Sequence, residues 1–449
     1  MRHGSTSFIS ILCILLGLTA CVPTINPDRR PSSGSLKFDD MIFIGDRYTA
    51  GMTNGSRTAD GRAGLYAEGQ AFAFPYLLST QVSNVLIDED KNPVAYHQHI
   101  ASESGSGYFE LEQVTFRECD GEVVSESITN RPSNPDWANE FPTLPTLNNF
   151  GIPFLKVADL FDQDKLTENF FYNRMIPQGE MVDQYPELYE TRTPTFVTLF
   201  LGVEDILAYA MNGGTLFSPN MTELETFKTN YGRLMDSIEV HAAEGFLGVV
   251  VNIPDVTDFP YFASIDPVLA QTEDCRQSGS TIFYRKDMNT NDVFVADENV
   301  RLMLSLQGRL GQENALGPAY GLTTDNPIPD QFVLDEEELM AITKQIEAYN
   351  ITLDSLVNAK RGEGNEPRWI LVDVNQKFAQ LKFGLNEGGL QVDNSHLSGG
   401  VFSLDGLTFT PRGTALFSNA IIESLNKKSL RKVRIPTFNI TNFPGVVFP

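Results

Sequence analysis

The chain has 449 residues, of which 41% are apolar, so it can bury a sizeable core and does not have the composition of a disordered protein. Its 58 acidic residues outnumber its 33 basic ones, which gives a formal net charge of −25. Nucleic acids and anionic lipid surfaces are bound chiefly through lysine and arginine. We therefore expect no nucleic-acid partner and no adhesion to membranes through protein charge.

The first 20 residues have the pattern of an export signal. Arg2 precedes an apolar run over residues 8–18, which is too short to span a bilayer as a helix but is typical of a signal peptide. The run ends in Leu-Thr-Ala-Cys, which resembles a bacterial lipobox and implies that Cys21 is lipidated. We expect a lipoprotein signal peptide at 1–20 and a flexible tether at 21–36. The alternative is an ordinary secretory signal in which Cys21 has no role.

This reading places the protein at the outer membrane, on the periplasmic or cell-surface side, and held there by its lipid anchor only. Of the four cysteines, Cys119 and Cys275 remain once the signal and the anchor are assigned. Free thiols outside the cytoplasm favour a disulfide. Their separation in sequence neither supports nor excludes a bond between them.

Four short runs are apolar on both faces, as buried parallel strands are. They cover residues 41–44, 195–200, 248–252 and 369–374. Helical patterns separate them. Thr222 and Glu225 resemble a capping box that begins one helix, Asp335 begins a second, and Thr410 caps a third. Strands alternating with helices predict an α/β fold with a parallel sheet.

Two long segments, from about 108 to 190 and from about 255 to 330, are rich in Pro, Asn and Asp and do not follow this alternation. Loops of that length usually carry function or small elements of their own. We expect a single domain over residues 37–449 in which both segments are insertions. They would form a cap over the carboxyl edge of the sheet, where α/β proteins bind ligands.

Three short blocks follow predicted strands or precede the last helix. Gly45-Asp46-Arg47 comes after the first strand and Gly202-Val203-Glu204-Asp205 after the second, while Asp405-Gly406-Leu407-Thr408 lies near the C-terminus. In order and surroundings these blocks resemble blocks I, III and V of the SGNH, or GDSL, hydrolases, with Gly105 or Gly107 in the place of the block II glycine. The resemblance extends over nearly the whole mature chain, to a lipoprotein branch of that superfamily. It implies a flavodoxin-like parallel sheet flanked by helices.

The catalytic residues of that family are not retained. The family has a serine nucleophile where this chain has Arg47, an oxyanion-binding asparagine where it has Glu204, and a histidine base where it has Thr408. A guanidinium cannot attack a carbonyl, a threonine hydroxyl is not a base near neutral pH, and a carboxylate repels an oxyanion. Of the triad only the acid, Asp405, remains. The resemblance therefore implies a degenerate site at Arg47, Asp405 and Thr408, with Gly105 and Glu204 at the oxyanion positions.

In the family fold these blocks converge at one edge of the sheet. Arg47 would then lie among several carboxylates, and a buried arginine needs such partners. We expect Arg47 to pair with Glu204 or Asp405.

A working enzyme could use other residues. Ser104, Ser106 and Thr49 lie near the relevant loops and His396 could supply a base, but no spacing places a nucleophile beside a base.

His97 and His99 would share a face of a strand, but no set of Cys, Asp or Glu completes a metal site around them. The acidic residues 335–338 fit the first turn of a helix better than a calcium loop. We expect no metal and no cofactor.

The function expected from these observations is a non-catalytic binding or scaffolding subunit that holds a glycan or a partner protein at the edge of the sheet. The alternative is an active serine esterase or acetyl-glycan deacylase that uses other residues. Whether the protein is an enzyme at all stays open at this point.

Overall fold

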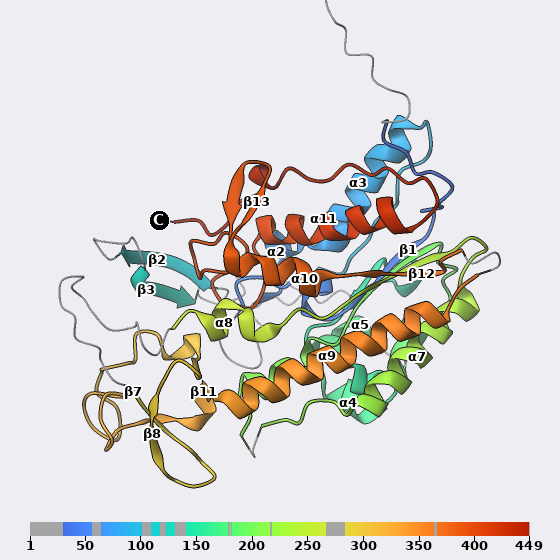
Figure 1. Ribbon diagram of the computed structural model, residues 1–449. Helices are drawn as coiled ribbons and strands as arrows, with labels where there is room; N and C mark the ends of the chain where they lie inside the picture. The colour runs from blue at the N-terminus through green and yellow to red at the C-terminus, as the bar shows by residue number, and fades with distance from the viewer. Residues whose placement is uncertain are drawn as a thin grey trace, which may run out of the picture.

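The computed structural model describes residues 30–55, 64–100, 109–116, 123–130, 141–177, 180, 182–215, 218–265, 283–362 and 366–448. A five-stranded, all-parallel sheet forms the centre of the molecule, as the sequence predicts (Figure 1). Its strands, in chain order, are β1 (Met41–Gly45), β4 (Asn149–Gly151), β5 (Phe196–Phe200), β6 (Leu247–Val251) and β12 (Trp369–Val372).

The spatial order of the strands is β4-β1-β5-β6-β12. The second strand of the sheet thus lies on one side of the first, and the other three follow on the opposite side. This is the flavodoxin-like order. Strands are added first on one side of β1 and then on the other, so the order of strands reverses between β1 and β5. In such sheets the crevice at the carboxyl ends of the two strands beside the reversal is the usual ligand site.

Helices cover both faces of the sheet. Figure 1 shows α3 and α11 on one face and α7 and α9 on the other. The helices are α1 (Arg47–Ala50), α2 (Ala67–Gln70), α3 (Phe74–Asp88), α4 (Gln163–Glu168), α5 (Phe170–Met175), α6 (Glu204–Ala210), α7 (Leu224–His241), α8 (Pro260–Ala263), α9 (Glu336–Ala359), α10 (Val374–Ala379) and α11 (Pro411–Lys428). Among the described residues, none of these helices is long and apolar enough to cross a bilayer.

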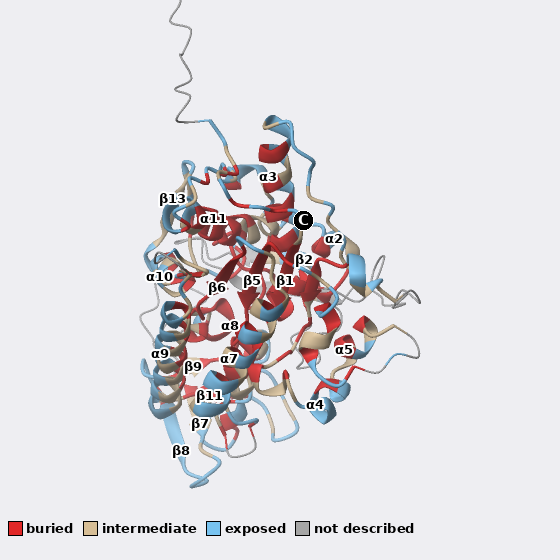
Figure 2. Ribbon diagram, turned by 90° about the vertical axis from the view of Figure 1, so that its right-hand side faces the viewer, coloured by how far each residue is buried: buried red, intermediate tan, exposed pale blue. Residues whose placement is uncertain are grey.

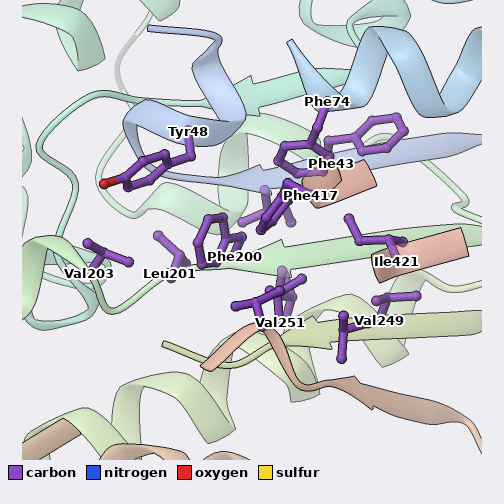
Figure 3. Close-up of a cluster of buried hydrophobic side chains, with 14 of the residues drawn as sticks. Phe43, Tyr48, Phe74, Phe200, Leu201, Val203, Val249, Val251, Phe417 and Ile421 are labelled. Carbon is purple, nitrogen blue, oxygen red and sulfur yellow. The ribbon is translucent and has the colours of Figure 1, made fainter. Parts of the chain in front are cut away.

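The main core lies on both faces of the sheet, where the helix layers pack against it. Figure 2 shows buried residues concentrated in β1, β5 and β6, between the two helix layers. On the side of α11, the ring of Phe417 lies 4.9 Å from that of Phe200 and 5.0 Å from that of Phe74 (Figure 3). Strands buried on both faces must be apolar throughout, which is why the sequence shows them as unbroken apolar runs.

The remaining strands form small sheets outside the central one. They are β2 (Phe109–Phe116) with β3 (Val123–Asn130), β7 (Phe283–Lys286) with β8 (Val293–Ala296) and β10 (Ile328–Pro329), β9 (Arg301–Leu302) with β11 (Val333–Leu334), and β13 (Leu385–Glu387) with β14 (Leu390–Val392). The strands between 283 and 334 surround an apolar cluster of their own that includes Phe283, Leu302 and Ile328.

Two predictions on local structure were wrong. The segment 108–190 is not wholly an insertion, because β4 within it pairs with β1 as an edge strand of the central sheet. The pair Thr222 and Glu225 does not form a capping box. Glu223 caps α7 without a side-chain bond, and the Thr222 hydroxyl donates to the carboxylate of Asp205 instead.

The predicted start of the long helix is confirmed. Asp335 caps α9 and accepts hydrogen bonds from the backbone N–H groups of Glu337 and Glu338, while Glu338 accepts one from the backbone N–H of Asp335. The Glu338 carboxyl is half-buried beside Asp335 and Asp330. Burial first, and these two neighbouring charges next, raise the pKa of Glu338 to about 8.

This shift gives a stability prediction. The folded protein holds a proton on Glu338 that the unfolded chain has already lost, so stability falls as pH rises from about 4.5 to about 8. Gln can accept the same capping bond without a charge. Glu338→Gln should therefore stabilise the protein at pH 9 by about 1 to 2 kcal/mol, a figure reduced for partial exposure, and leave it nearly unchanged at pH 4. Urea unfolding at both pH values measures this.

The control is Glu347→Gln on the exposed face of the same helix, which should change stability by less than about 0.5 kcal/mol at either pH. An equal gain for both variants, or a gain for Glu338→Gln that does not grow with pH, would contradict the assignment.

Candidate functional site

The chain turns sharply after β1 and after β5, the two strands beside the reversal point. A Cβ on Gly45 would lie 1.9 Å from the Thr49 hydroxyl oxygen and 2.5 Å from the backbone oxygen of Phe200, so only glycine fits there. The backbone of Gly202 has φ +115°, a conformation that residues other than glycine rarely adopt. These two glycines let the starts of α1 and α6 approach each other at the carboxyl edge of the sheet.

The first residues of α1 and α6 form a buried ion pair across this edge. Arg47 Nε donates to Glu204 Oε1, and Arg47 Nη2 donates to Glu204 Oε2 at 2.8 Å. The two residues are only 4% and 3% exposed. The expected pairing of Arg47 with Glu204 is therefore confirmed, and its geometry is the two-pronged one that suits a guanidinium and a carboxylate.

Phe154 covers the ion pair. Its ring centroid lies 4.7 Å from Cζ of Arg47, within the range of a cation–π contact. The backbone of Phe154 has φ +66°, which is strained for a large side chain. The local structure therefore holds this residue in an unfavourable conformation in which its ring lies against the guanidinium.

Asp205, next to Glu204, holds the loop that carries Phe154. Its carboxylate accepts hydrogen bonds from the backbone N–H groups of Val157 and Ala158 and from the hydroxyl of Thr222, at 2.8, 3.3 and 2.6 Å. Burial raises the pKa of Asp205 to about 6, although these bonds oppose the shift. The carboxylate thus ties the loop after β4 to α6 and to the segment before α7.

The charges of the site are balanced locally. Burial first, and then the charge of Glu204, raise the pKa of Asp46 well above its usual value. Burial lowers the pKa of the Arg47 guanidinium, but the charge and hydrogen bonds of Glu204 outweigh this and raise it overall. The guanidinium of Arg47 therefore keeps its charge, and its hydrogen bonds go to the carboxylate of Glu204.

Asp405 and Thr408 form a separate network. The Asp405 carboxylate accepts hydrogen bonds from the backbone N–H groups of Leu407 and Thr408, both at 2.8 Å, and from the hydroxyls of Thr408 and Ser403, at 2.7 and 2.9 Å. The two hydroxyl oxygens lie 2.7 Å apart. Asp405 thus orients two buried hydroxyls and not an imidazole. The alternative pairing of Arg47 with Asp405 is not the one observed.

Of the other candidate residues, those that the structure describes do not assemble into a catalytic group. Nε2 of His396 lies 3.1 Å from the backbone oxygen of Leu404, and the hydroxyl of Thr49 is buried beneath Gly45. His97 is exposed and His99 is half-buried. In the described part of the chain, no group of three or more His, Cys, Asp or Glu residues could hold a metal ion.

Several predicted positions lie outside the described residues: Cys21, Ser104, Gly105, Ser106, Gly107, Cys119 and Cys275. The lipidation, the disulfide and the oxyanion glycine therefore stay predictions.

Three residues of the site were not predicted. Phe154 has no local sequence signal, because its role depends on a strained backbone and on a contact with Arg47 more than a hundred positions away. Ser403 bonds to Asp405 and Thr408, which are close in sequence, but its residue type alone does not indicate that contact. Thr222 was assigned to a helix cap, because a threonine three residues before a glutamate suits a capping box as well as it suits a bond to Asp205.

Phe154 also lines a surface groove of about 810 Å³. Besides aromatic rings such as that of Phe170, its lining carries the charged and amide side chains of Lys156, Asn220 and Glu223. The groove is thus next to the point where ligands of such sheets usually bind. Phe154 both covers the Arg47–Glu204 pair and lines the groove.

No model of a known protein family matches this sequence, and no curated protein matches it significantly.

The buried ion pair can be tested by a double-mutant cycle with Arg47→Met and Glu204→Met. Each single change leaves the other charge buried without its partner and should cost about 3 to 5 kcal/mol. The double variant removes both charges, so its cost should be at least about 2 kcal/mol below the sum of the two. Chemical unfolding at neutral pH gives the coupling energy.

The exposed pair Lys165–Glu168, whose side chains are 54% and 68% exposed, is the control, with an expected coupling below about 1 kcal/mol. Additive costs for Arg47 and Glu204 would show that the pair does not act as a unit.

Proposed function

We propose that this chain is a lipid-anchored, extracytoplasmic protein of the SGNH-hydrolase type whose catalytic site is degenerate, and that it acts as a binding or scaffolding subunit. The observation that carries the proposal is the Arg47–Glu204 ion pair, because it fills the position at the end of β1 where that family places its nucleophile. A guanidinium cannot act as a nucleophile, and Glu204 presents no hydrogen-bond donor to an oxyanion.

The network around Asp405 supports the same proposal. Acyl transfer needs a base that accepts the proton of the nucleophile. Thr408 and Ser403 beside Asp405 are fully buried hydroxyls that bond to each other and to the carboxylate. Neither is a base near neutral pH, so the acid of the former triad has no proton acceptor to orient.

The loops around this edge support a cap. The backbone N–H of Tyr261, in α8, donates to the backbone oxygen of Gly406 at 3.0 Å, and α8 also packs on β9. The segment 255–330 therefore reaches the loop of Asp405. A cap of this kind leaves room for a ligand only outside the ion pair, and the groove next to Phe154 is the space that we assign to it.

A glycan suits this groove better than a protein surface does. Aromatic rings can pack on the C–H faces of a sugar, while the amide of Asn220 and the charges of Lys156 and Glu223 can bond to its hydroxyls.

The alternative is an esterase or acetyl-glycan deacylase that uses other residues. Its test is the purified mature chain, residues 21–449, with an activated acetyl ester and a serine-reactive fluorophosphonate. We expect neither turnover nor labelling, because the described site offers no activated hydroxyl. Stoichiometric labelling together with turnover would establish the enzyme and refute our proposal.

The mapping onto the family is tested by restoring its residues. The triple variant Arg47→Ser, Glu204→Asn, Thr408→His should hydrolyse the acetyl ester faster than the unmodified protein. Because position 408 is fully buried against Ser403, a version that also carries Ser403→Gly makes room for the imidazole. The matched control has Ala in place of Ser at position 47 and should be inactive. Equal rates for control and restored variants would refute the mapping.

Binding in the groove is tested with chitotetraose and cellotetraose by thermal shift and calorimetry. We expect one of these sugars to stabilise the protein. Phe170→Ser should weaken its binding about tenfold, which corresponds to the loss of one aromatic contact. Phe294→Ser, at a 42% exposed phenylalanine of β8 that does not line the groove, is the control and should not change the affinity. Binding unaffected by Phe170→Ser would place the sugar elsewhere.

A further inference from the structure

A small, partly enclosed cavity lies between α2, α5 and the end of β4, and neither Arg47 nor Glu204 lines it. Figure 2 labels α2 and α5 on the same side of the molecule. The lining of the cavity includes Gln70, His99, Asn149, Gly151 and Arg174, and its volume is about 20 Å³. A space of that size holds one water molecule or one ion of similar dimensions.

Three nitrogen atoms of the lining are buried without a partner. They are Nε2 of His99 and Nε and Nη2 of Arg174, for which no hydrogen-bond acceptor occurs among the described residues. Both guanidinium nitrogens carry hydrogen and can only donate. A buried donor that lacks an acceptor is costly, and more so when it carries a charge.

Other arginines of this chain show how that cost is usually met. Arg47 pairs with Glu204, and Arg192 pairs with Asp40. The guanidinium of Arg174 instead lies 5.4 Å from the ring centroid of Phe141, which offers a cation–π contact but no acceptor in the plane of the nitrogens. Burial, and then the charge of Arg174, lower the pKa of His99 to about 4. Near neutral pH, Arg174 is therefore the charged member of the two.

We propose that this cavity binds a single small monovalent anion, chloride or bromide, between Arg174 and His99. A halide can accept hydrogen bonds from both guanidinium nitrogens and neutralises Arg174, and it accepts one more from His99 in the tautomer that carries its hydrogen on Nε2. Water is less suitable, because its own two hydrogens need acceptors. A halide also matches the single positive charge of Arg174, whereas a doubly charged sulfate or phosphate would leave an uncompensated negative charge in the cavity. The site is independent of the function proposed above, and its failure would leave that proposal untouched.

A salt series tests the proposal on the intact mature chain. At equal ionic strength, about 100 mM chloride or bromide should raise Tm by about 2 °C relative to sulfate, because a ligand that binds only the folded state stabilises it. General exclusion of salts from protein surfaces predicts the opposite order, with sulfate the most stabilising. If sulfate raises the Tm of the unmodified protein more than chloride and bromide do, the proposal is overturned.

The variant Arg174→Met removes both unpaired guanidinium donors and the charge. It should abolish the advantage of chloride over sulfate. The matched control is Arg233→Met, because exposed Arg233 also lies over a ring, 3.8 Å from the centroid of Phe161, but lines no such cavity. Arg233→Met should keep the full halide response. Equal responses in the two variants would overturn the proposal.

A crystal of the unmodified protein grown with bromide provides a further test, which does not depend on the folding of any variant. We expect an anomalous bromide peak within hydrogen-bond distance of Arg174 Nε and His99 Nε2. An ordered water in that position, in crystals that bind bromide elsewhere, would overturn the proposal.

Discussion

A guanidinium and a carboxylate that are buried together constrain everything around them. Taking two charges out of water is expensive, and their attraction repays this only when the geometry is close and the remaining polar atoms are satisfied. Arg47 and Glu204 reach a close, two-pronged geometry because Gly45 and Gly202 allow α1 and α6 to start within reach of each other. The buried carboxyl of Asp46 and the ring of Phe154 complete the enclosure.

The position of this pair decides which function the sheet edge can perform. In the flavodoxin-like order, the crevice between β1 and β5 is where a ligand or a reacting group is expected. Here that crevice is occupied by side chains that bind each other, and the groove that we propose for a ligand lies farther out. Asp205 fixes the loop after β4, and that loop contributes Phe154 both to the enclosed pair and to the outer groove. The same contacts that close the inner site thus shape the outer one.

The parts of the structure that sequence predicts are those that depend on local pattern. β1, β5, β6 and β12 are unbroken apolar runs, and Asp335 and Thr410 are N-caps, a role that depends on neighbours within three residues. β4 was missed because three residues in a polar segment become a strand only by pairing with β1, a contact across about a hundred positions. The conformation of Phe154 was missed for a related reason, since a positive φ at phenylalanine is imposed by its surroundings and not by its type.

The pairing of Arg47 could be predicted because a charge substituted at the end of a buried strand must find a counter-charge. The same rule makes Arg174 informative. The chain carries 58 acidic side chains, and a carboxylate is the ordinary partner of a buried guanidinium. Around Arg174, the described residues offer an aromatic ring, an uncharged imidazole and a cavity the size of one small ion. One constraint therefore applies to both sites: at the sheet edge the protein supplies the counter-charge itself, and beside α5, where the described residues offer none, we assign that role to an anion from the solution.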